Sequence, residues 1–220
     1  MGYYRATHRV LRSGPAPAGT VVLIHGLFLG SFILNRVARR FHAGNWDIVK
    51  YDYPTMRKKI RAHGADLAEL LDSPLFDDIP RIDFVTHSMG GLLLRSAVDL
   101  LTDARRKQLG RAVMIAPPNR GSDVARLAVR LVPGAEYLVA PIADLSSAPH
   151  SFANTFPIPD HMPETGIIAS SHDHQVRLEY TSFGNCPRII LPGSHTGVLF
   201  HPETAEQAFR FIRTGTFSAE

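Results

Sequence analysis

With 220 residues, the chain is long enough for one domain that buries roughly three quarters of its unfolded surface. Hydrophobic residues account for 45% of it and charged residues for 20%, a balance typical of a globular protein and not of a disordered one. The net charge is +4, but the basic clusters contain no interleaved aromatic residues of the kind that stack on bases, so we expect no nucleic-acid partner.

Cys186 is the one cysteine of the sequence, which excludes an intrachain disulfide, and no metal-ligand spacing surrounds it. No apolar run reaches the length that spans a bilayer, and the first residues lack the apolar core of a secretory signal. The sequence therefore predicts a cytoplasmic protein without stable membrane insertion and without a metal or other cofactor. It leaves the oligomeric state open.

Short apolar runs bounded by turn residues predict strands over residues 20–24, 46–51, 81–86, 111–116, 166–169 and 188–191. Helices are predicted over residues 31–41, with Ser31 as the cap, over 58–71, from just after Ser88, and over 202–213. Because apolar strands alternate with helices, we expect an α/β fold. Its mostly parallel sheet of about six strands should carry helices on both faces.

Residues 118–163 break this alternation. They contain short amphipathic runs and several prolines, and they lie between two predicted strands. Ligands of parallel α/β sheets bind at the carboxyl edge of the strands, where such an insertion would lie. We therefore expect a single domain over residues 1–220, with a small cap at about residues 118–163.

The most informative segment is Thr86-His-Ser88-Met-Gly90-Gly91, which joins a predicted strand to a predicted helix. A serine at such a sharp turn is held in a strained conformation, with its hydroxyl exposed at the end of the sheet. The pattern is Gly-x-Ser-x-Gly with Thr86 in place of the first glycine. It predicts a nucleophile at Ser88, and the alternative is a serine that only caps the helix.

A serine nucleophile needs a base, for which histidine is suited because it titrates near neutrality. The sequence has 11 histidines, so position must decide. His195 follows the last predicted strand in a loop of small residues and is the candidate, with His201 as the alternative. Asp173, after the strand at 166–169, is the candidate that orients this base.

Asp144 and Asp160 are the alternatives for the acid, and Asp173 could instead be a turn residue. His172 and His174 flank it, but two such histidines without a third ligand nearby are a weak metal signal. The oxyanion of the reaction needs two backbone N–H donors, which we assign to Met89 and Leu27.

The loop that contains Leu27 follows the first predicted strand, and Gly26 permits its tight turn. Phe28 and Phe32 are the candidate substrate-binding residues. No Gly-x-Gly-x-x-Gly run follows a strand, and there is no phosphate-binding loop.

Taken together, these motifs resemble the α/β-hydrolase superfamily, in particular its small bacterial lipase- and esterase-like members. The matching elements are His25-Gly26, Thr86 to Gly91, Ala116 to Ser122, Asp173 to Val176 and His195. The resemblance implies the α/β-hydrolase fold and the catalytic order Ser88, Asp173, His195. The leader before Thr20 is short for the two opening strands of the family, which implies a reduced sheet.

The predicted function is hydrolysis of a carboxylic ester with an apolar acyl group, through an acyl-enzyme on Ser88. The substrate would be a small-molecule or lipid ester. A thioesterase or an acyltransferase would use the same three residues, so both remain alternatives. A third alternative is a binding protein that has the fold without turnover.

Overall fold

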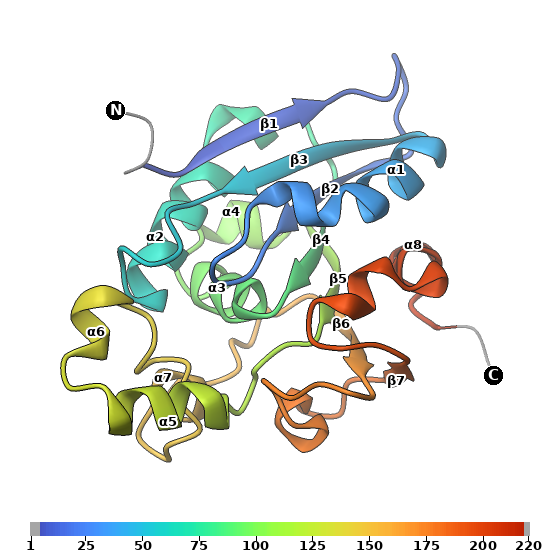
Figure 1. Cartoon of the computed structure of the whole chain (residues 1–220). Coiled ribbons are helices and arrows are strands. Elements are labelled where there is room, and N and C mark those ends of the chain that lie inside the picture. The colour runs from blue at the N-terminus through green and yellow to red at the C-terminus, as the bar shows by residue number, and fades with distance from the viewer. Residues whose placement is uncertain (1–4, 218–220) are drawn as a thin grey trace.

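The computed structural model of the chain describes residues 5–217, and in it one sheet contains seven strands (Figure 1). The strands, in sheet order, are β1 (Thr7–Leu11), β3 (Trp46–Asp52), β2 (Gly19–Ile24), β4 (Ile82–His87), β5 (Leu109–Ile115), β6 (Glu164–Ser170) and β7 (Arg188–Leu191). All neighbours pair in parallel except β1, which is antiparallel to β3.

The six predicted strands are all present, and β1 is the strand that the sequence did not predict. It lies at the edge of the sheet and is mostly exposed, so it lacks the apolar run that identified the others. The central strand β4 is buried along its whole length, as expected for a strand covered on both faces.

Two pairs of helices cover the sheet. Helices α1 (Asn35–Ala43) and α8 (Pro202–Thr214) pack on one face, and α2 (Ile60–Leu71) and α3 (Met89–Val98) pack on the other. Each pair encloses its own apolar core against the sheet. No helix within residues 5–217 is both long and apolar enough to cross a membrane.

The predicted cap at Ser31 is wrong. Residues Ser31–Leu34 form a 3-10 turn before α1, and no side chain caps that helix. The Ser31 hydroxyl instead donates to the carboxylate of Asp52 at 2.6 Å. The Ser31 hydroxyl is therefore bonded to the end of β3 and not to the helix.

Between β5 and β6 the chain forms three short helices, at the lower left of Figure 1: α5 (Asp123–Leu131), α6 (Ala135–Leu138) and α7 (Phe152–Thr155). Helix α5 is amphipathic, but its apolar residues Val124, Leu127 and Leu131 are exposed. This segment therefore presents apolar side chains to solvent instead of packing them against the core.

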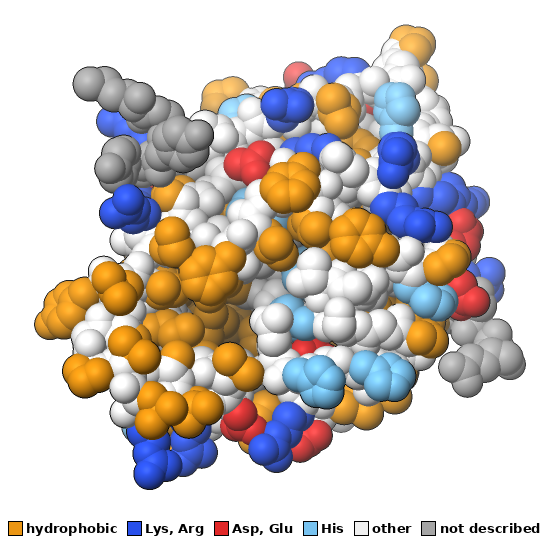
Figure 2. Space-filling view, in the orientation of Figure 1, with side chains coloured by type: hydrophobic (Ala, Val, Ile, Leu, Met, Phe, Trp, Pro, Cys, Tyr) orange, Lys and Arg blue, Asp and Glu red, His pale blue; other side chains and the backbone are white. Residues whose placement is uncertain are grey.

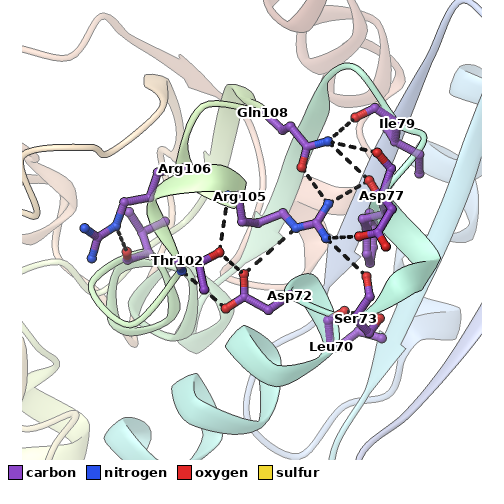
Figure 3. A network of polar contacts seen from close by, with 11 residues as sticks. Leu70, Asp72, Ser73, Asp77, Ile79, Thr102, Arg105, Arg106 and Gln108 are labelled. Carbon is purple, nitrogen blue, oxygen red and sulfur yellow. Dashed lines mark hydrogen bonds and ion pairs between the residues drawn. The ribbon is translucent and has the colours of Figure 1, made fainter.

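Helix α4 (Asp103–Arg106) is fixed to the end of α2 by a polar network around Arg105 (Figure 3). The Arg105 guanidinium donates to the Phe76 carbonyl at 2.6 Å and to the Asp77 carboxylate at 2.8 Å. Asp72 lies 4.0 Å from it and accepts a bond from the Thr102 hydroxyl. This buried cation thus has two acidic partners.

Candidate active site

Ser88 lies at the turn between β4 and α3, with φ 51° and ψ −125°, a backbone conformation that non-glycine residues rarely adopt. Its N–H donates to the carbonyl of Ile115 at 2.9 Å, which ties the turn to β5. A Cβ on Gly90 would lie 2.6 Å from the carbonyl oxygen of Ile24, so only glycine fits at that position. Gly91 is less restricted, because its nearest neighbour would be the sulfur of Met114 at 3.3 Å.

Three side chains predicted to act together are hydrogen-bonded in series. His195 Nε2 lies 2.8 Å from Ser88 Oγ, and His195 Nδ1 lies 2.7 Å from Asp173 Oδ2. Ser88 and His195 are buried, and the side chain of Asp173 is only 3% exposed. In this arrangement the imidazole can take a proton from the serine while Asp173 fixes its orientation.

The Asp173 carboxylate is held from both sides. Its second oxygen accepts bonds from the N–H groups of Gln175 and Val176 at 2.8 and 2.9 Å. Burial raises the pKa of this carboxyl, but the hydrogen bonds from His195 and the two amides outweigh burial, so that its pKa lies below the ordinary 3.8. Asp173 is therefore ionised beside the imidazole at neutral pH.

The alternatives to these residues do not take part in this series of hydrogen bonds. His201 accepts a bond from the N–H of Glu203 at the start of α8. Asp144 accepts a bond from the N–H of Ile60 at 2.8 Å, at the start of α2. Asp160 is exposed in a turn between α7 and β6. Over residues 5–217, no group of three His, Cys, Asp or Glu side chains is arranged to hold a metal ion.

The loop after β2 lies directly against the serine turn. A Cβ on Gly26 would come within 2.9 Å of the Cβ of Ser88, which places the backbone of this loop beside the hydroxyl-bearing residue. None of the hydrogen bonds within the described part of the chain uses the N–H of Leu27 or of Met89. Both amides are therefore free to receive a ligand, as the assignment of these donors requires.

Tyr53 and Thr55 support this loop, although no sequence motif marks either residue. The Tyr53 hydroxyl donates to the carbonyl of His25 at 2.7 Å, and its ring stacks on the imidazole of His25 with centroids 4.5 Å apart. Thr55 Oγ1 accepts from the N–H of Phe28, whose φ is 60°. These contacts hold the loop in an irregular conformation.

His87 was also missed, although it directly precedes Ser88. Its ring is fully buried, and Nε2 lies 3.0 Å from the carbonyl oxygen of His195. Burial lowers the pKa of His87 to about 3, so the ring is neutral and donates through Nε2–H. His87 thus fixes the backbone of the loop that carries the candidate base.

A pocket of about 280 Å³ opens beside Ser88 and His195. It is lined mainly by apolar side chains, among them Leu27, Phe28, Val124, Ile142, Leu145 and Val176. Phe32 was predicted to contact the substrate, but it is not one of the lining residues and is 65% exposed. The 3-10 turn that begins at Ser31 directs Phe32 outward.

Apolar side chains also gather on the surface around this pocket, at the lower left of Figure 2, where the surface is hollowed. They come from α5 and α6 and from the segments beside them: Phe28, Val124, Leu127, Leu131, Val132, Tyr137 and Leu138. Tyr137 is 89% exposed and Leu138 73%. A monomeric protein rarely exposes so many neighbouring apolar groups without a functional reason.

Comparison with solved structures identifies the fold. The lipase BlEst2 of Bacillus licheniformis, in its mature form, superposes with a TM-score of 0.74 over 96% of this chain and 98% of that chain, at 18% identity. Est1E of Butyrivibrio proteoclasticus gives 0.66 over 94% and 92%, at 17% identity. YbtT, a type II thioesterase of yersiniabactin biosynthesis, gives 0.60 over 95% and 99%, at 16% identity. The chain has the α/β-hydrolase fold.

The family follows from the sequence itself. Residues 5–138, which are more than half of the chain, match a family described as a domain of unknown function (DUF7379), and the chain belongs to this family. No curated protein matches the sequence.

Proposed function

We propose that this protein is a serine hydrolase that cleaves carboxylic esters with apolar acyl groups. The observation that carries the proposal is the unbroken series of hydrogen bonds from Ser88 through His195 to Asp173, at 2.8 and 2.7 Å. A serine beside an imidazole that is itself oriented by a carboxylate is the arrangement that activates a hydroxyl for acyl transfer.

In the proposed reaction, Ser88 Oγ attacks the ester carbonyl while its proton passes to His195 Nε2. The N–H groups of Leu27 and Met89 receive the oxyanion that forms. Collapse of this intermediate breaks the bond to the alcohol, which leaves with the proton from His195, and an acyl-enzyme remains. Water then attacks the acyl group and gives a proton to His195. His195 passes this proton to Ser88 Oγ as the bond to the acyl group breaks, which releases the carboxylic acid and restores Ser88.

The pocket supports an apolar acyl or alcohol group, because the side chains around Ser88 are mainly apolar. Residues 118–163 would act as a cap within a single domain of residues 1–220, since Ile142 and Leu145 of this segment line the pocket. Thioester cleavage or transfer to another alcohol would use the same groups. The structural neighbours include a lipase and a thioesterase, which supports oxyesters and thioesters alike as candidate substrates. In this proposal the enzyme acts in the cytoplasm.

A fluorophosphonate probe provides the direct test, because it forms a covalent bond only with an activated serine. We expect the probe to label Ser88 in the parent protein and to leave the Ser88→Ala variant unlabelled. Turnover is then measured on p-nitrophenyl esters and on acyl thioesters of graded chain length. Labelling without turnover of either class would favour the non-catalytic alternative, and thioester cleavage alone would change the substrate class.

A further inference from the structure

The proposed reaction makes no use of Arg95, although this residue lies on α3, the helix that begins just after Ser88. Arg95 is only 3% exposed. Its two terminal nitrogens donate to backbone carbonyls, one to Asn119 at 3.3 Å and the other to Phe156. Its Nε–H is buried without a hydrogen-bond partner, and no carboxylate of residues 5–217 pairs with the guanidinium.

The other deeply buried arginine of the protein shows what Arg95 lacks. Arg105 is 5% exposed, and its guanidinium has Asp77 at 2.8 Å and Asp72 at 4.0 Å (Figure 3). A buried charge that is not compensated by an opposite charge is costly. Arg95 has the flanking rings of Phe156 and Phe183, with centroids 5.9 and 5.3 Å away, but rings do not supply a countercharge.

A recess of about 420 Å³ opens onto Arg95. Its walls combine apolar side chains, among them Phe156, Ile158 and Phe183, with Asn119, whose Oδ1 is also buried without a partner. Arg120 lines the recess too and is exposed. None of the described residues that line this recess is acidic, and none of them also lines the pocket beside Ser88.

We propose that this recess is a second ligand site, which binds a carboxylate attached to an apolar group. The carboxylate would pair with the Arg95 guanidinium, which supplies the free Nε–H and a positive charge. The apolar group would lie against Phe156, Ile158 and Phe183. One buried cation matches the single charge of a carboxylate better than the double charge of a phosphate monoester, which would stay partly uncompensated.

The charge on Arg95 is present under ordinary conditions. Burial lowers the pKa of this guanidinium to about 10, which still leaves it protonated at neutral pH. Because Arg95 also binds the carbonyl of Phe156, a ligand held by Arg95 would contact the loop after α7 and the core helix α3 together. The proposal rests on this recess alone and does not depend on the function proposed for Ser88.

The test measures binding of hexanoate to the parent protein by isothermal titration calorimetry, with neutral hexanamide and inorganic phosphate as comparison ligands. The matched variants are Ile158→Glu and Ile158→Gln. Ile158 is 45% exposed, so neither substitution disturbs the core, and it does not line the Ser88 pocket. The glutamate places a carboxylate inside the recess, whereas glutamine has the same shape without the charge.

We expect hexanoate to bind and hexanamide and phosphate to bind much more weakly. Both variants lose the apolar contact of Ile158, but Ile158→Glu should bind hexanoate at least about tenfold more weakly than Ile158→Gln, because only the glutamate repels the carboxylate. Arg95→Gln, shown to be folded by circular dichroism, should lose hexanoate binding as well. Equal affinity in the glutamate and glutamine variants would place the ligand elsewhere, for example beside Ser88, and would overturn the proposal. So would the absence of hexanoate binding, or phosphate binding more tightly than hexanoate.

Discussion

At the scale of single residues, the site depends on a conformation that Ser88 does not favour by itself. A positive φ on a residue with a side chain costs on the order of 1–3 kcal/mol, and the surrounding contacts must hold it. Here the bond to the Ile115 carbonyl and the close backbone approach at Gly26 and Gly90 do so. The turn could be predicted from the neighbouring glycines, because only a residue without a side chain permits such a close backbone approach.

The first prediction concerns Ser88. Replacing it with alanine removes the nucleophile but keeps the backbone contacts, so we expect a folded protein whose ester turnover falls by about 10⁴–10⁶-fold. Circular dichroism and thermal unfolding provide the control for folding. Turnover close to the parent rate in this variant would show that Ser88 is not the nucleophile.

The second prediction separates the three candidate acids. Asp173→Asn should lower kcat by roughly 10³–10⁴-fold, because the amide cannot stabilise the imidazolium and can hold His195 in the wrong tautomer. Asp144→Asn and Asp160→Asn should stay near the parent, since one binds the start of α2 and the other is exposed. If Asp144→Asn lost more activity than Asp173→Asn, the assignment of the acid would be wrong.

At the scale of elements, the apolar runs of the sequence were sufficient to predict the central strands and the helices after them. The exposed edge strand β1 and the loops were harder to predict, because their structure depends on partners far away in the chain. β1 is mostly exposed and is defined by its pairing with β3. Ser31 resembles a helix cap in the sequence, and its bond to Asp52 appears only once β3 is in place.

The third prediction tests how closely α3 approaches β2. A methyl group at Gly90 would lie 2.6 and 2.8 Å from the carbonyl oxygens of Ile24 and His25, so Gly90→Ala must displace the helix or the loop. We expect the free energy of unfolding, measured by urea unfolding, to fall by about 1–3 kcal/mol. We also expect kcat to fall, by more than the loss of folded protein would explain. Gly91→Ala is the matched control and should be much milder, because its nearest contact would be at 3.3 Å.

The fourth prediction concerns His63, which is fully buried on α2 with its ring edge-on to that of Tyr53. Burial lowers its pKa to about 4 from 6.5. At a pH between these two values, the unfolded chain therefore binds a proton that the folded protein does not bind. As a result, the free energy of unfolding falls as the pH is lowered from about 6.5 to 4.

His63→Leu removes this titration. When the pH is lowered from 7 to 4, the free energy of unfolding of the variant should fall by about 1–3 kcal/mol less than that of the parent. Urea unfolding at both pH values measures this difference. Parallel losses in the two proteins would mean that His63 is already protonated in the folded state, or that it does not titrate in this range.

At the scale of the whole molecule, sheet order explains why residues far apart in sequence meet. Ser88 follows β4, Asp173 follows β6 and His195 follows β7, and these strands lie in the order β4-β5-β6-β7 with the same direction. Their loops therefore emerge at one edge. The sequence predicted these positions, because each residue comes just after an apolar run. It could not predict Arg95 as a buried unpaired cation, because exposure and partners depend on the assembled fold.

The last prediction concerns access to the site. A lid that opened only on lipid would hide its apolar face in solution, but here Val124, Leu127 and Leu131 of α5 are already exposed, and the pocket beside Ser88 is open. We therefore expect hydrolysis of p-nitrophenyl butyrate below its solubility limit, with a rate that saturates smoothly and does not jump when the ester begins to separate from water. The Leu127→Ser/Leu131→Ser double variant should keep the parent kcat on this soluble ester, because neither side chain lines the pocket. A sharp increase at the solubility limit, abolished in the double variant, would instead show that the enzyme is switched on by an interface through α5.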